Sequence, residues 1–416
     1  MGDLPAAGSL NDRPLSYKTK REKKMRGKIS LINFSLLLML VGCNRSYEFK
    51  TASAHNAVKY PDNKWYKDSA IVDEGWDGSK LKQADDYARQ IGTAAYMVIY
   101  KGEVIHSYGD IQRKYWIHSI WKALERAIVG VYITNGIIDT IKTLKQLQID
   151  DKPKLTEQEK TATVADIIRM RSGIVHNAAA ENQQMRESKP KRDEYNPGEK
   201  YFYNNWDANV LETIVSKETK KGFYENFSQM ISGPIEMESF DKSDVVYQYD
   251  LESSGIPSVR VKMSTVDLAR FGLLILNGGK WKDKQIIPQQ WVEQCLKPQA
   301  RIESGEVGLF WLRVTIGPFR YIRMYSADGY GGHQLNIFPD NDLIFIHRAN
   351  TFNKENYILD VTKIVGLMYR IFDAKRDIFP EEFFKAINNE GVDSIKELTK
   401  GMVKRERKEL GLDKEK

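Results

Sequence analysis

The most constraining feature of the sequence is the tetrad Ser119-Ile120-Trp121-Lys122, which opens a long apolar stretch that runs to Ile138. If this stretch forms a helix, residues three apart share one face, so the amine of Lys122 reaches the hydroxyl of Ser119. A serine beside an amine is an activated nucleophile, because the hydroxyl needs a base before it attacks. The helix dipole also favours negative charge at the start of the helix. The tetrad therefore predicts a helix that begins with a catalytic serine.

The serine–lysine spacing is not unique in this chain. It also occurs in Ser79 with Lys82, Ser188 with Lys191, and Ser239 with Lys242. The first two lie in lysine-rich polar runs, which are typical of solvated surface. The tetrad alone therefore does not identify the nucleophile, and other segments must support it.

Two downstream segments give that support. Tyr203-Asn204-Asn205 follows the turn signal Asn196-Pro197-Gly198 and precedes an apolar helical run. A tyrosine phenol relays protons, and an amide holds a lysine or a substrate carbonyl, although Tyr224-Glu225-Asn226 has the same spacing. Residues 327–333, Ala-Asp-Gly-Tyr-Gly-Gly-His, open a strand-like run. Their glycines allow a strand backbone to approach a ligand closely.

These three segments, in this order, resemble the serine beta-lactamase and penicillin-binding-protein superfamily. The resemblance is strongest to its class C-like branch of esterases, D,D-peptidases and amide hydrolases. Further runs support it: Trp76 to Leu81 looks like the entry segment, Tyr203 to Asn209 like a recurrent Y-N-N-W-D-x-N run, and Met263 to Gly272 like the helix after the substrate cleft. The resemblance covers about residues 64 to 374.

The resemblance implies a role for each matching residue. Ser119 attacks the substrate carbonyl, and Lys122 takes or shares its proton. Tyr203 is the second member of the proton relay, and Asn205 orients Lys122 or the substrate amide. The backbone N–H groups of Ser119 and Tyr330 form an oxyanion hole, where each donor is worth about 3 to 4 kcal/mol. The substrate-binding positions implied in the third segment are Ala327, Gly329, Tyr330 and His333.

The third segment departs from the pattern of the superfamily. Much of the superfamily begins this motif with a lysine or histidine that holds a substrate carboxylate, whereas here Ala327 is followed by Asp328. The departure argues against beta-lactams and D-alanyl carboxylates as substrates. Arg323 and Arg348 lie on flanking strand-like segments and are candidate replacements, although solvated surface positions are the favoured interpretation of both.

The amino-terminal region predicts export. A lysine- and arginine-rich segment precedes an apolar run from Ile29 to Val41. This run of about 13 residues is shorter than the 20 or so that a spanning helix needs, and it fits a signal-peptide core. It ends in Leu40-Val41-Gly42-Cys43, which looks like a bacterial lipobox with Cys43 as the lipidated residue. An amphipathic helix or a chance cysteine is the alternative. Asn44 favours the outer membrane or cell surface, and Met25 is a plausible start.

Composition agrees with an exported globular enzyme. The chain has 416 residues, 41% of them hydrophobic, which supports one large domain or two intertwined ones. The formal charge of +7 is modest and comes partly from the basic leader, so nucleic-acid binding is not expected. If Cys43 is lipidated, Cys295 has no partner for a disulfide.

The coarse pattern predicts an α/β (α+β) fold of the beta-lactamase and transpeptidase type. A hairpin is expected over residues 94–107, followed by a mostly helical region from 119 to about 277. Strands are expected again at 308–314, 320–325, 334–338 and 343–347, followed by a helix over 356–372. Antiparallel strands from both chain ends would thus form one sheet with flanking helices and an inserted helical region. The expected divisions are a polar extension 1–24, a signal peptide 25–42, a tether 43–62, the hydrolase domain 63–374, and a charged tail 375–416. In this tail Phe383, Phe384, Ile387, Ile395 and Leu398 suggest one or two short helices, and a solvated appendage is favoured over a partner-binding element.

Two functions of different classes remain open. The first is a lipid-anchored serine hydrolase that cleaves a small ester or amide, with a peptidoglycan fragment among the candidate substrates. The second is a catalytically weak binding or structural lipoprotein of the same fold; a D,D-peptidase or beta-lactamase is a variant of the first. The histidines lack the spacing of metal motifs, so no metal or cofactor is expected. His118 is expected to pack or bond locally, and His333 to line the cleft.

Overall fold

The computed structural model describes residues 58–62, 64–65, 75–352 and 359–390. All of them belong to one of two units, residues 49–416. The expected signal peptide and Cys43 lie outside the described residues. Within the described ranges, no helix has both the length and the apolar character needed to cross a membrane.

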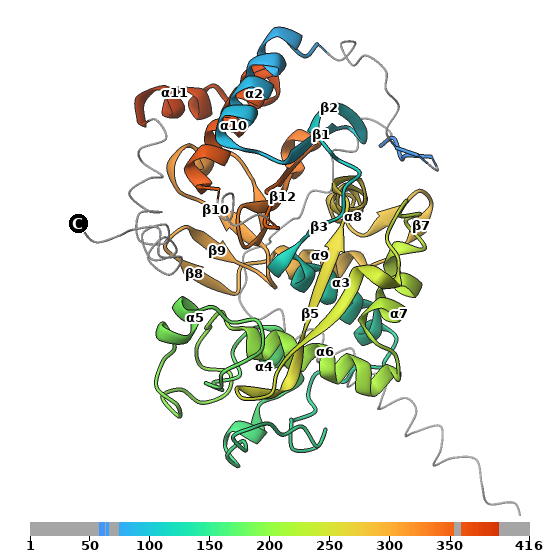
Figure 1. The fold of residues 1–416 in the computed structure, drawn as a ribbon, viewed down its shortest axis with the longest axis vertical. Helices are drawn as coiled ribbons and strands as arrows, with labels where there is room; N and C mark the ends of the chain where they lie inside the picture. Colours follow the sequence, from blue (N-terminus) through green and yellow to red (C-terminus); the bar gives the residue numbers. More distant parts are fainter. Residues whose placement is uncertain (1–57, 63, 66–74, 353–358, 391–416) are drawn as a thin grey trace, which may run out of the picture. The chain divides into compact units, whose positions relative to one another are not determined.

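The described residues form a large antiparallel sheet of eight strands in the order β2-β1-β13-β12-β11-β10-β9-β8 (Figure 1). Strand β1 pairs with β13 from Ala95 opposite Arg348 to Tyr100 opposite Leu343. The sheet is therefore assembled from both ends of the domain, which confirms the predicted fold class. Its strands are β1 (Ala95–Tyr100), β2 (Glu103–Gly109), β8 (Ala300–Ile302), β9 (Gly305–Val307), β10 (Leu312–Val314), β11 (Tyr325–Gly329), β12 (His333–Phe338) and β13 (Leu343–Arg348).

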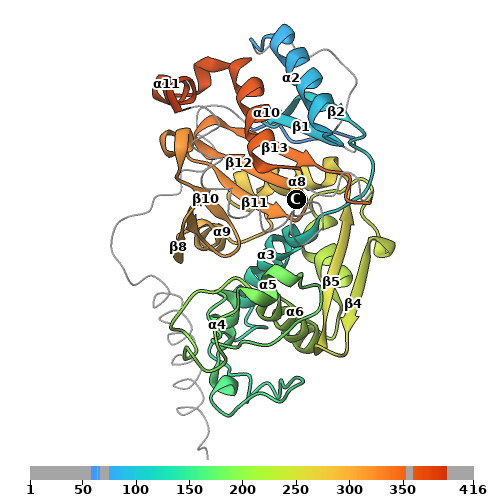
Figure 2. The same ribbon diagram turned by 60° about the vertical axis from the view of Figure 1, so that its left-hand side comes forward.

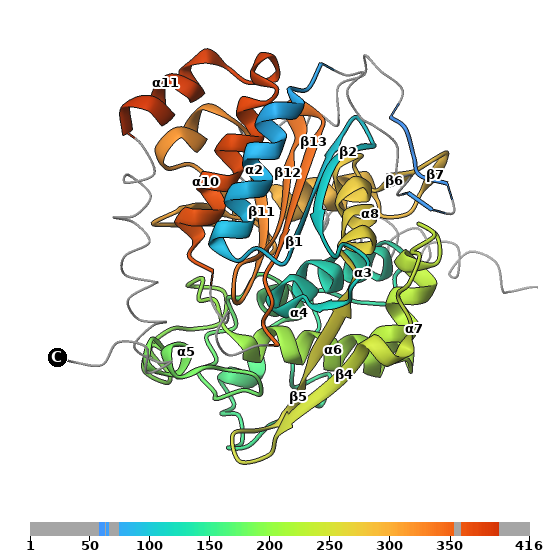
Figure 3. The same cartoon turned by 45° about the horizontal axis from the view of Figure 1, so that its top comes forward.

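Helices cover both faces of the central strands (Figure 3). Helices α2 (Gly78–Ile91) and α10 (Val361–Asp373) pack on one face and share a large apolar cluster with β1 and β13. Helix α8 (Thr265–Leu276) packs against β1, β12 and β13 on the other face. A Cβ atom at Gly272 would lie 2.8 Å from Leu335 Cδ1, so the glycine lets α8 approach the sheet closely.

The core extends beyond residue 374, where the sequence places the start of a charged tail. Helix α11 (Glu381–Glu390) buries Phe383 and Phe384. The ring of Phe383 lies 6.1 Å from that of Phe372 and 5.6 Å from that of Phe379. These contacts make α11 part of the packed structure, while residues 391–416 lie outside the described ones.

Most of the remaining elements form the inserted region, which is mostly helical as expected (Figure 2). A small sheet in the order β3-β5-β4 runs alongside it. Its strands are β3 (Tyr115–Trp116), β4 (Val245–Asp250) and β5 (Ser254–Met263). The helices are α3 (Trp121–Thr134), α4 (Val164–Ile168), α5 (Gln183–Glu187), α6 (Asn205–Thr219), α7 (Phe223–Phe227) and α9 (Gln289–Leu296). A π-helical turn spans Ser228–Ser232, and a hairpin is formed by β6 (Lys280–Trp281) and β7 (Lys284–Gln285). The 3-10 helices are His118–Ile120, Glu159–Thr161, Lys242–Asp244, Gly317–Tyr321, Pro339–Asn341 and Arg376–Ile378.

Three segments differ from the sequence-based expectations. The expected strand over 320–325 is not formed: a 3-10 helix, Gly317–Tyr321, with Pro318 in its first turn, ends within this segment, and β11 begins only at Tyr325. The expected strand over 308–314 starts only at Leu312, because Phe310 turns the chain with a φ of +75°. The helix expected to run to Ile138 ends at Thr134, and Gly136 follows with a φ of +71°. In each case local turn geometry overrides the apolar pattern.

Candidate active site

Ser119 lies in a tight 3-10 turn between strand β3 and helix α3. The strand is fixed on β5, since the N–H of Ile117 donates to the carbonyl of Val261 at 2.9 Å. His118 then takes a left-handed backbone conformation with a φ of +46°, and α3 begins two residues after Ser119. Non-glycine residues rarely adopt this conformation, and such outliers cluster at functional sites. The turn places the half-buried hydroxyl at the start of the helix.

Lys122 is almost completely buried, with 2% of its surface exposed, on the first turn of α3. Its Nζ lies 3.2 Å from Ser119 Oγ, 3.1 Å from Tyr203 OH and 3.0 Å from Asn205 Oδ1. All three of these side chains therefore lie within hydrogen-bond distance of the lysine nitrogen. The rings of Trp121, Tyr203 and Phe310 lie within 5.9 Å of the Nζ. The lysine is therefore held in one position.

The start of α6 supplies the other two side chains. Asn204 caps this helix by accepting a 2.7 Å bond from the N–H of Asp207. Tyr203, just before the cap, donates from its hydroxyl to Ser119 Oγ at 2.9 Å. Asn205, just after it, faces Lys122. The four residues that the motifs predicted thus lie together, and Ser119, Lys122 and Tyr203 form a closed triangle of hydrogen bonds.

The third segment lies beside this triangle. A Cβ atom at Gly329 would lie 2.5 Å from the carbonyl oxygen of Ile117, so only glycine allows the end of β11 to pack against the nucleophile turn. Tyr330 packs its ring 5.7 Å from that of His118. Ala327 and His333 are fully buried. His333 was expected to line the cleft; it is buried, and the centre of its ring lies 5.3 Å from that of His118.

Two predicted environments differ from those observed. His118 bonds far along the chain rather than locally, with its Nε2 3.0 Å from Thr351 Oγ1. Arg348, expected at a solvated surface, is fully buried and donates to the carbonyls of Tyr115 and Met263. It therefore braces the β3–β5 pair and does not replace the missing cation of the third segment. Arg323 donates to Asp340 on the outside of the sheet.

Burial sets the protonation of the histidine beside the nucleophile. Desolvation, helped by the charges of Arg260, Arg348 and Lys122, lowers the pKa of His118 to about 3. The imidazole is therefore neutral at physiological pH, and it positions Thr351 without adding charge to the site.

Two acids lie behind the site on α6. Burial raises the pKa of Asp207 to about 7, although its carboxylate accepts a 2.5 Å bond from the Ser172 hydroxyl. Burial likewise raises the pKa of Glu212 to about 7; it accepts from Ser216 and Tyr247. Neither side chain contacts Ser119, so we assign both acids to the packing of helix α6.

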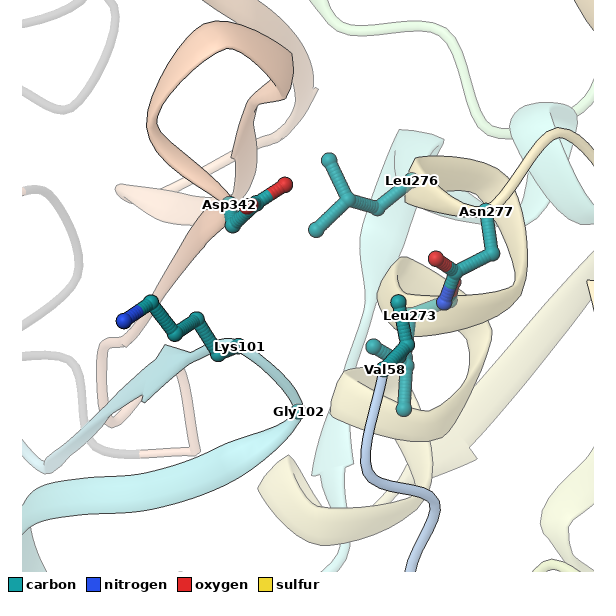
Figure 4. A pocket seen from close by; sticks show the side chains of 7 residues that line it. All are labelled: Val58, Lys101, Gly102, Leu273, Leu276, Asn277 and Asp342. Atoms are coloured by element: carbon teal, nitrogen blue, oxygen red, sulfur yellow. The ribbon is translucent and has the colours of Figure 1, made fainter. Parts of the chain in front are cut away.

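Two further features were considered in the described part of the chain, a metal site and a second cavity. Among the described residues, no group of three or more His, Cys, Asp or Glu side chains is placed to hold a metal ion. A small cavity lies between the β1–β2 turn and α8 (Figure 4), and its lining includes Lys101, Leu273 and Asp342. Its volume of about 10 Å³ is close to that of one water probe, which is too small for a substrate.

Comparison with known families identifies the family of this chain. A model of the beta-lactamase family matches residues 70–364, which is most of the chain. The chain belongs to the beta-lactamase family. It is therefore a hydrolase of the beta-lactamase fold. A search of curated protein sequences found no match.

Solved structures agree with the family assignment at the level of the fold. A protein described as a 6-aminohexanoate-dimer hydrolase from Bacillus anthracis is 18% identical, with a TM-score of 0.55 over 78% of this chain and 92% of that one. A family VIII carboxylesterase is 13% identical, with a TM-score of 0.54 over 74% and 99%. A protein described as a beta-lactamase from Bacteroides dorei is 14% identical, with a TM-score of 0.53 over 72% and 99%.

Proposed function

We propose that this beta-lactamase family member is a serine hydrolase that cleaves an ester or amide through an acyl-enzyme on Ser119. The observation that carries the proposal is the closed triangle of Ser119, Lys122 and Tyr203. A purely structural protein of this fold has no need for a buried lysine within hydrogen-bond distance of a serine, a tyrosine and an amide. The same observation favours an enzyme over a catalytically weak binding protein.

The triangle provides a route for the protons of both half-reactions. With Lys122 in its free-amine form, Ser119 Oγ bonds to the substrate carbonyl carbon while its proton passes to Lys122 Nζ, directly or through Tyr203 OH, and both atoms lie within 3.2 Å of Oγ. The relay then protonates the leaving alcohol or amine as its bond to the carbonyl carbon breaks. In the second half, water gives a proton to the same relay, attacks the acyl carbon and releases the acid with a regenerated serine.

Backbone groups complete the proposed chemistry. The N–H groups at the start of a helix have no acceptor within that helix, and Ser119 lies in the 3-10 turn that leads into α3. We place the oxyanion between the N–H of Ser119 and that of Tyr330, in the hairpin whose Gly329 packs on the nucleophile turn. These donors oppose the charge that develops on the carbonyl oxygen.

The third segment supports an ester or amide rather than a beta-lactam as the substrate. The fully buried Ala327 offers no cation, and the neighbouring Asp328 is exposed, with its Oδ1 bonded to Ser326 Oγ at 2.5 Å. A carboxylate next to the scissile bond, as in penicillins and D-alanyl peptides, would therefore meet an acid rather than a base. The carboxylesterase and the dimer hydrolase among the structural neighbours are consistent with this choice.

We also propose that the enzyme is an exported lipoprotein anchored through Cys43, on the outer membrane or cell surface. The support is the sequence alone: a basic segment, a short apolar run, and Leu-Val-Gly-Cys at its end. The anchor would keep a small ester or amide, including a peptidoglycan fragment, within reach of the site.

A fluorophosphonate probe tests the nucleophile. The probe should label the wild-type protein at Ser119 and should fail to label Ser119→Ala. Ser239→Ala, at another serine with a lysine three residues later, is the matched control and should retain labelling. Labelling that survives in Ser119→Ala would remove the proposed mechanism. A wild-type protein that is folded and not labelled would favour the binding protein instead.

A further inference from the structure

Phe310 is an aromatic side chain beside the relay that the proposed mechanism does not use. It lies in the connection between β9 and β10 of the large sheet, far along the chain from the nucleophile turn. The centre of its ring lies 5.9 Å from Lys122 Nζ and 6.4 Å from the centre of the Tyr203 ring. Lys122 Nζ is itself 3.2 Å from Ser119 Oγ. The Phe310 ring is therefore a neighbour of the groups that carry the protons of the proposed reaction.

The Phe310 ring also has surface that a ligand can contact. The rings of Trp121, Tyr203 and Phe310 lie around the Lys122 nitrogen. Trp121 is 3% exposed and belongs to the core, and Tyr203 is a member of the relay. Phe310 is half-buried, as are Ser119 and Tyr203. Of these three rings, Phe310 is the one that combines exposed surface with no part in proton transfer.

The backbone holds Phe310 in an unusual conformation. Its φ of +75° is one that non-glycine residues rarely adopt, and such strain persists where the surrounding structure imposes it. The N–H of Gly308 donates to the Trp311 carbonyl at 2.8 Å. The N–H of Leu309 donates to the Cys295 carbonyl at 2.8 Å, and a Cβ atom at Gly308 would lie 2.1 Å from the same oxygen. These contacts fix the turn and, with it, the position of the ring.

The relay decides which part of the substrate meets the ring. In the proposed reaction Lys122 or Tyr203 gives a proton to the leaving alcohol or amine, so the leaving atom must come within about 3 Å of one of them. A flat group on that atom then comes within the roughly 4.5 to 7 Å at which two aromatic rings pack, with Phe310 as its partner. The acyl part carries no atom that has to approach the relay.

We propose that Phe310 is a specificity-determining residue whose ring forms one wall of the leaving-group site, so that the enzyme prefers esters and amides with a flat aromatic leaving group. The inference rests on the proposed function and deepens it. It assigns Phe310 to the formation of the acyl-enzyme and not to its hydrolysis, because the leaving group is absent from the second half-reaction.

Two esters with the same acyl group test the preference. Benzyl acetate and cyclohexylmethyl acetate have leaving alcohols with equal numbers of carbon atoms, and only the first has a flat aromatic ring. The ratio of their kcat/KM values should favour benzyl acetate in wild type. It should fall about two- to tenfold in Phe310→Leu, which keeps an apolar side chain and removes the aromatic pair. Phe310→Asn should lower the ratio as well, and asparagine tolerates a positive φ, so this variant decides the question if Phe310→Leu does not fold.

Two controls make the result specific. Phe240→Leu is the matched variant, because Phe240 is also half-buried and its ring packs against those of Tyr224 and Phe227 instead. It should keep the wild-type ratio. The second control moves the ring to the acyl side: 4-nitrophenyl phenylacetate and 4-nitrophenyl cyclohexylacetate share one leaving group. The ratio of their kcat/KM values should be the same in Phe310→Leu as in wild type.

Hydrolysis of the acyl-enzyme separates this role from a purely structural one. Rapid mixing with 4-nitrophenyl acetate measures the rate constant for hydrolysis of the acetyl-enzyme, which should be unchanged in Phe310→Leu. A ring that only positioned Lys122 would behave differently, because the relay serves both half-reactions and its displacement would slow both.

The outcomes distinguish this inference from the proposed function. Retained turnover with an unchanged ratio of the two acetates in both Phe310 variants would overturn the leaving-group site and leave the serine hydrolase intact. Equal losses for the two acetates with slower hydrolysis of the acetyl-enzyme, or a fall in the acyl-side ratio, would overturn it as well. Absence of ester turnover in wild type together with absence of fluorophosphonate labelling would overturn the proposed function itself.

Discussion

Asn205 donates a 2.7 Å hydrogen bond from its Nδ2 to the carbonyl oxygen of Ala180, and this bond fixes which end of the amide faces Lys122. With the donor end held by Ala180, the Oδ1 is directed at Lys122 Nζ at 3.0 Å. Ala180 has a left-handed backbone conformation, with a φ of +63°, in the loop between α4 and α5. A loop residue thus determines the orientation of an amide in the active site.

Asn205→Ala should lower kcat/KM by about tenfold or more, because a hydrogen bond to a charged group is typically worth about 1.5 to 3 kcal/mol. Asn209→Ala is the matched control, since Asn209 bonds the neighbouring Ala179 carbonyl at 3.3 Å from the next turn of α6. The control removes a loop contact without touching Lys122 and should retain most activity. Equal losses in the two variants would show that Asn205 only holds the loop.

Removal of either relay member should impair turnover while the fold is kept. Lys122→Ala should reduce kcat by about 10²- to 10⁴-fold, the usual contribution of general-base assistance. Tyr203→Phe keeps the ring beside Phe310 and removes only the hydroxyl that bonds Ser119. Tyr201→Phe, two residues earlier, is the control. Wild-type rates of ester hydrolysis in Lys122→Ala or Tyr203→Phe would contradict the role assigned to that residue.

The residues of the triangle and its amide were predicted from local motifs together with the family resemblance, because neither the serine–lysine spacing nor the tyrosine–asparagine spacing is unique in this chain. A serine and lysine three apart fall on one helical face, and a helix start fixes Tyr203 and Asn205 within three positions. The partners of His118 and Asn205, Thr351 and Ala180, depend on how separate segments meet in the fold. No local pattern marks such contacts, so they appear only in the structure.

The difference between local patterns and contacts of separate segments also explains which elements of the fold were predicted. Short strand-like runs beside turn signals predicted β1, β12 and β13, which are buried along their whole length. The buried position of Arg348 was missed, because a single arginine at a strand end is usually solvated and only the β3–β5 pair explains its burial. Apolar residues in the charged tail predicted a short helix, which α11 confirms, but the sequence favoured a solvated appendage, whereas Phe383 and Phe384 complete the core.

The anchor prediction concerns Cys43, which lies outside the described residues. Expressed from Met25 in a bacterium, the protein should fractionate with membranes and incorporate a labelled fatty acid. Cys43→Ser should abolish the label and release the protein, because the cysteine sulfur carries the lipid. Stable anchoring is expected to need more than one acyl chain, since a single chain binds only marginally. A soluble, unlabelled wild-type protein would contradict the lipobox interpretation.

The free energy of unfolding should decrease as the pH rises from about 5 to about 8, because Glu212 has a raised pKa in the folded protein. Its pKa is raised to about 7 in the folded protein, so the folded state binds the proton more tightly than the unfolded state does. The resulting stabilisation is complete below the ordinary glutamate pKa and is lost as the pH rises through 7. For a pKa shift of this size, the free energy of unfolding falls by roughly 3 kcal/mol.

Glu212→Gln tests this source of pH dependence. Glutamine resembles the protonated acid and does not titrate, so the variant should lose less unfolding free energy than wild type between pH 5 and pH 8. Urea denaturation at several pH values measures the difference. Glu252→Gln, at an exposed glutamate, should keep the wild-type slope. An unchanged slope in Glu212→Gln would assign the pH dependence to other groups.

The substrate class should follow from Ala327 and Asp328. Two like charges about 4 Å apart repel by roughly 1 kcal/mol in water and several times more in a partly dry cleft. Substrates with a carboxylate next to the scissile bond should therefore bind poorly. We expect measurable hydrolysis of short-chain aryl esters and very weak hydrolysis of penicillins and cephalosporins.

Replacing the third-segment residues should shift this selectivity. Asp328→Thr removes the exposed negative charge and should raise the ratio of kcat/KM for a chromogenic cephalosporin to that for a nitrophenyl ester. Ala327→Lys, alone or with Asp328→Thr, should raise the ratio further if the fold accommodates it, because Ala327 is fully buried and a larger side chain strains a packed site. Asp328→Thr alone therefore keeps the prediction testable. Efficient cephalosporin turnover by the wild-type protein would show that the missing cation at Ala327 does not set the substrate class.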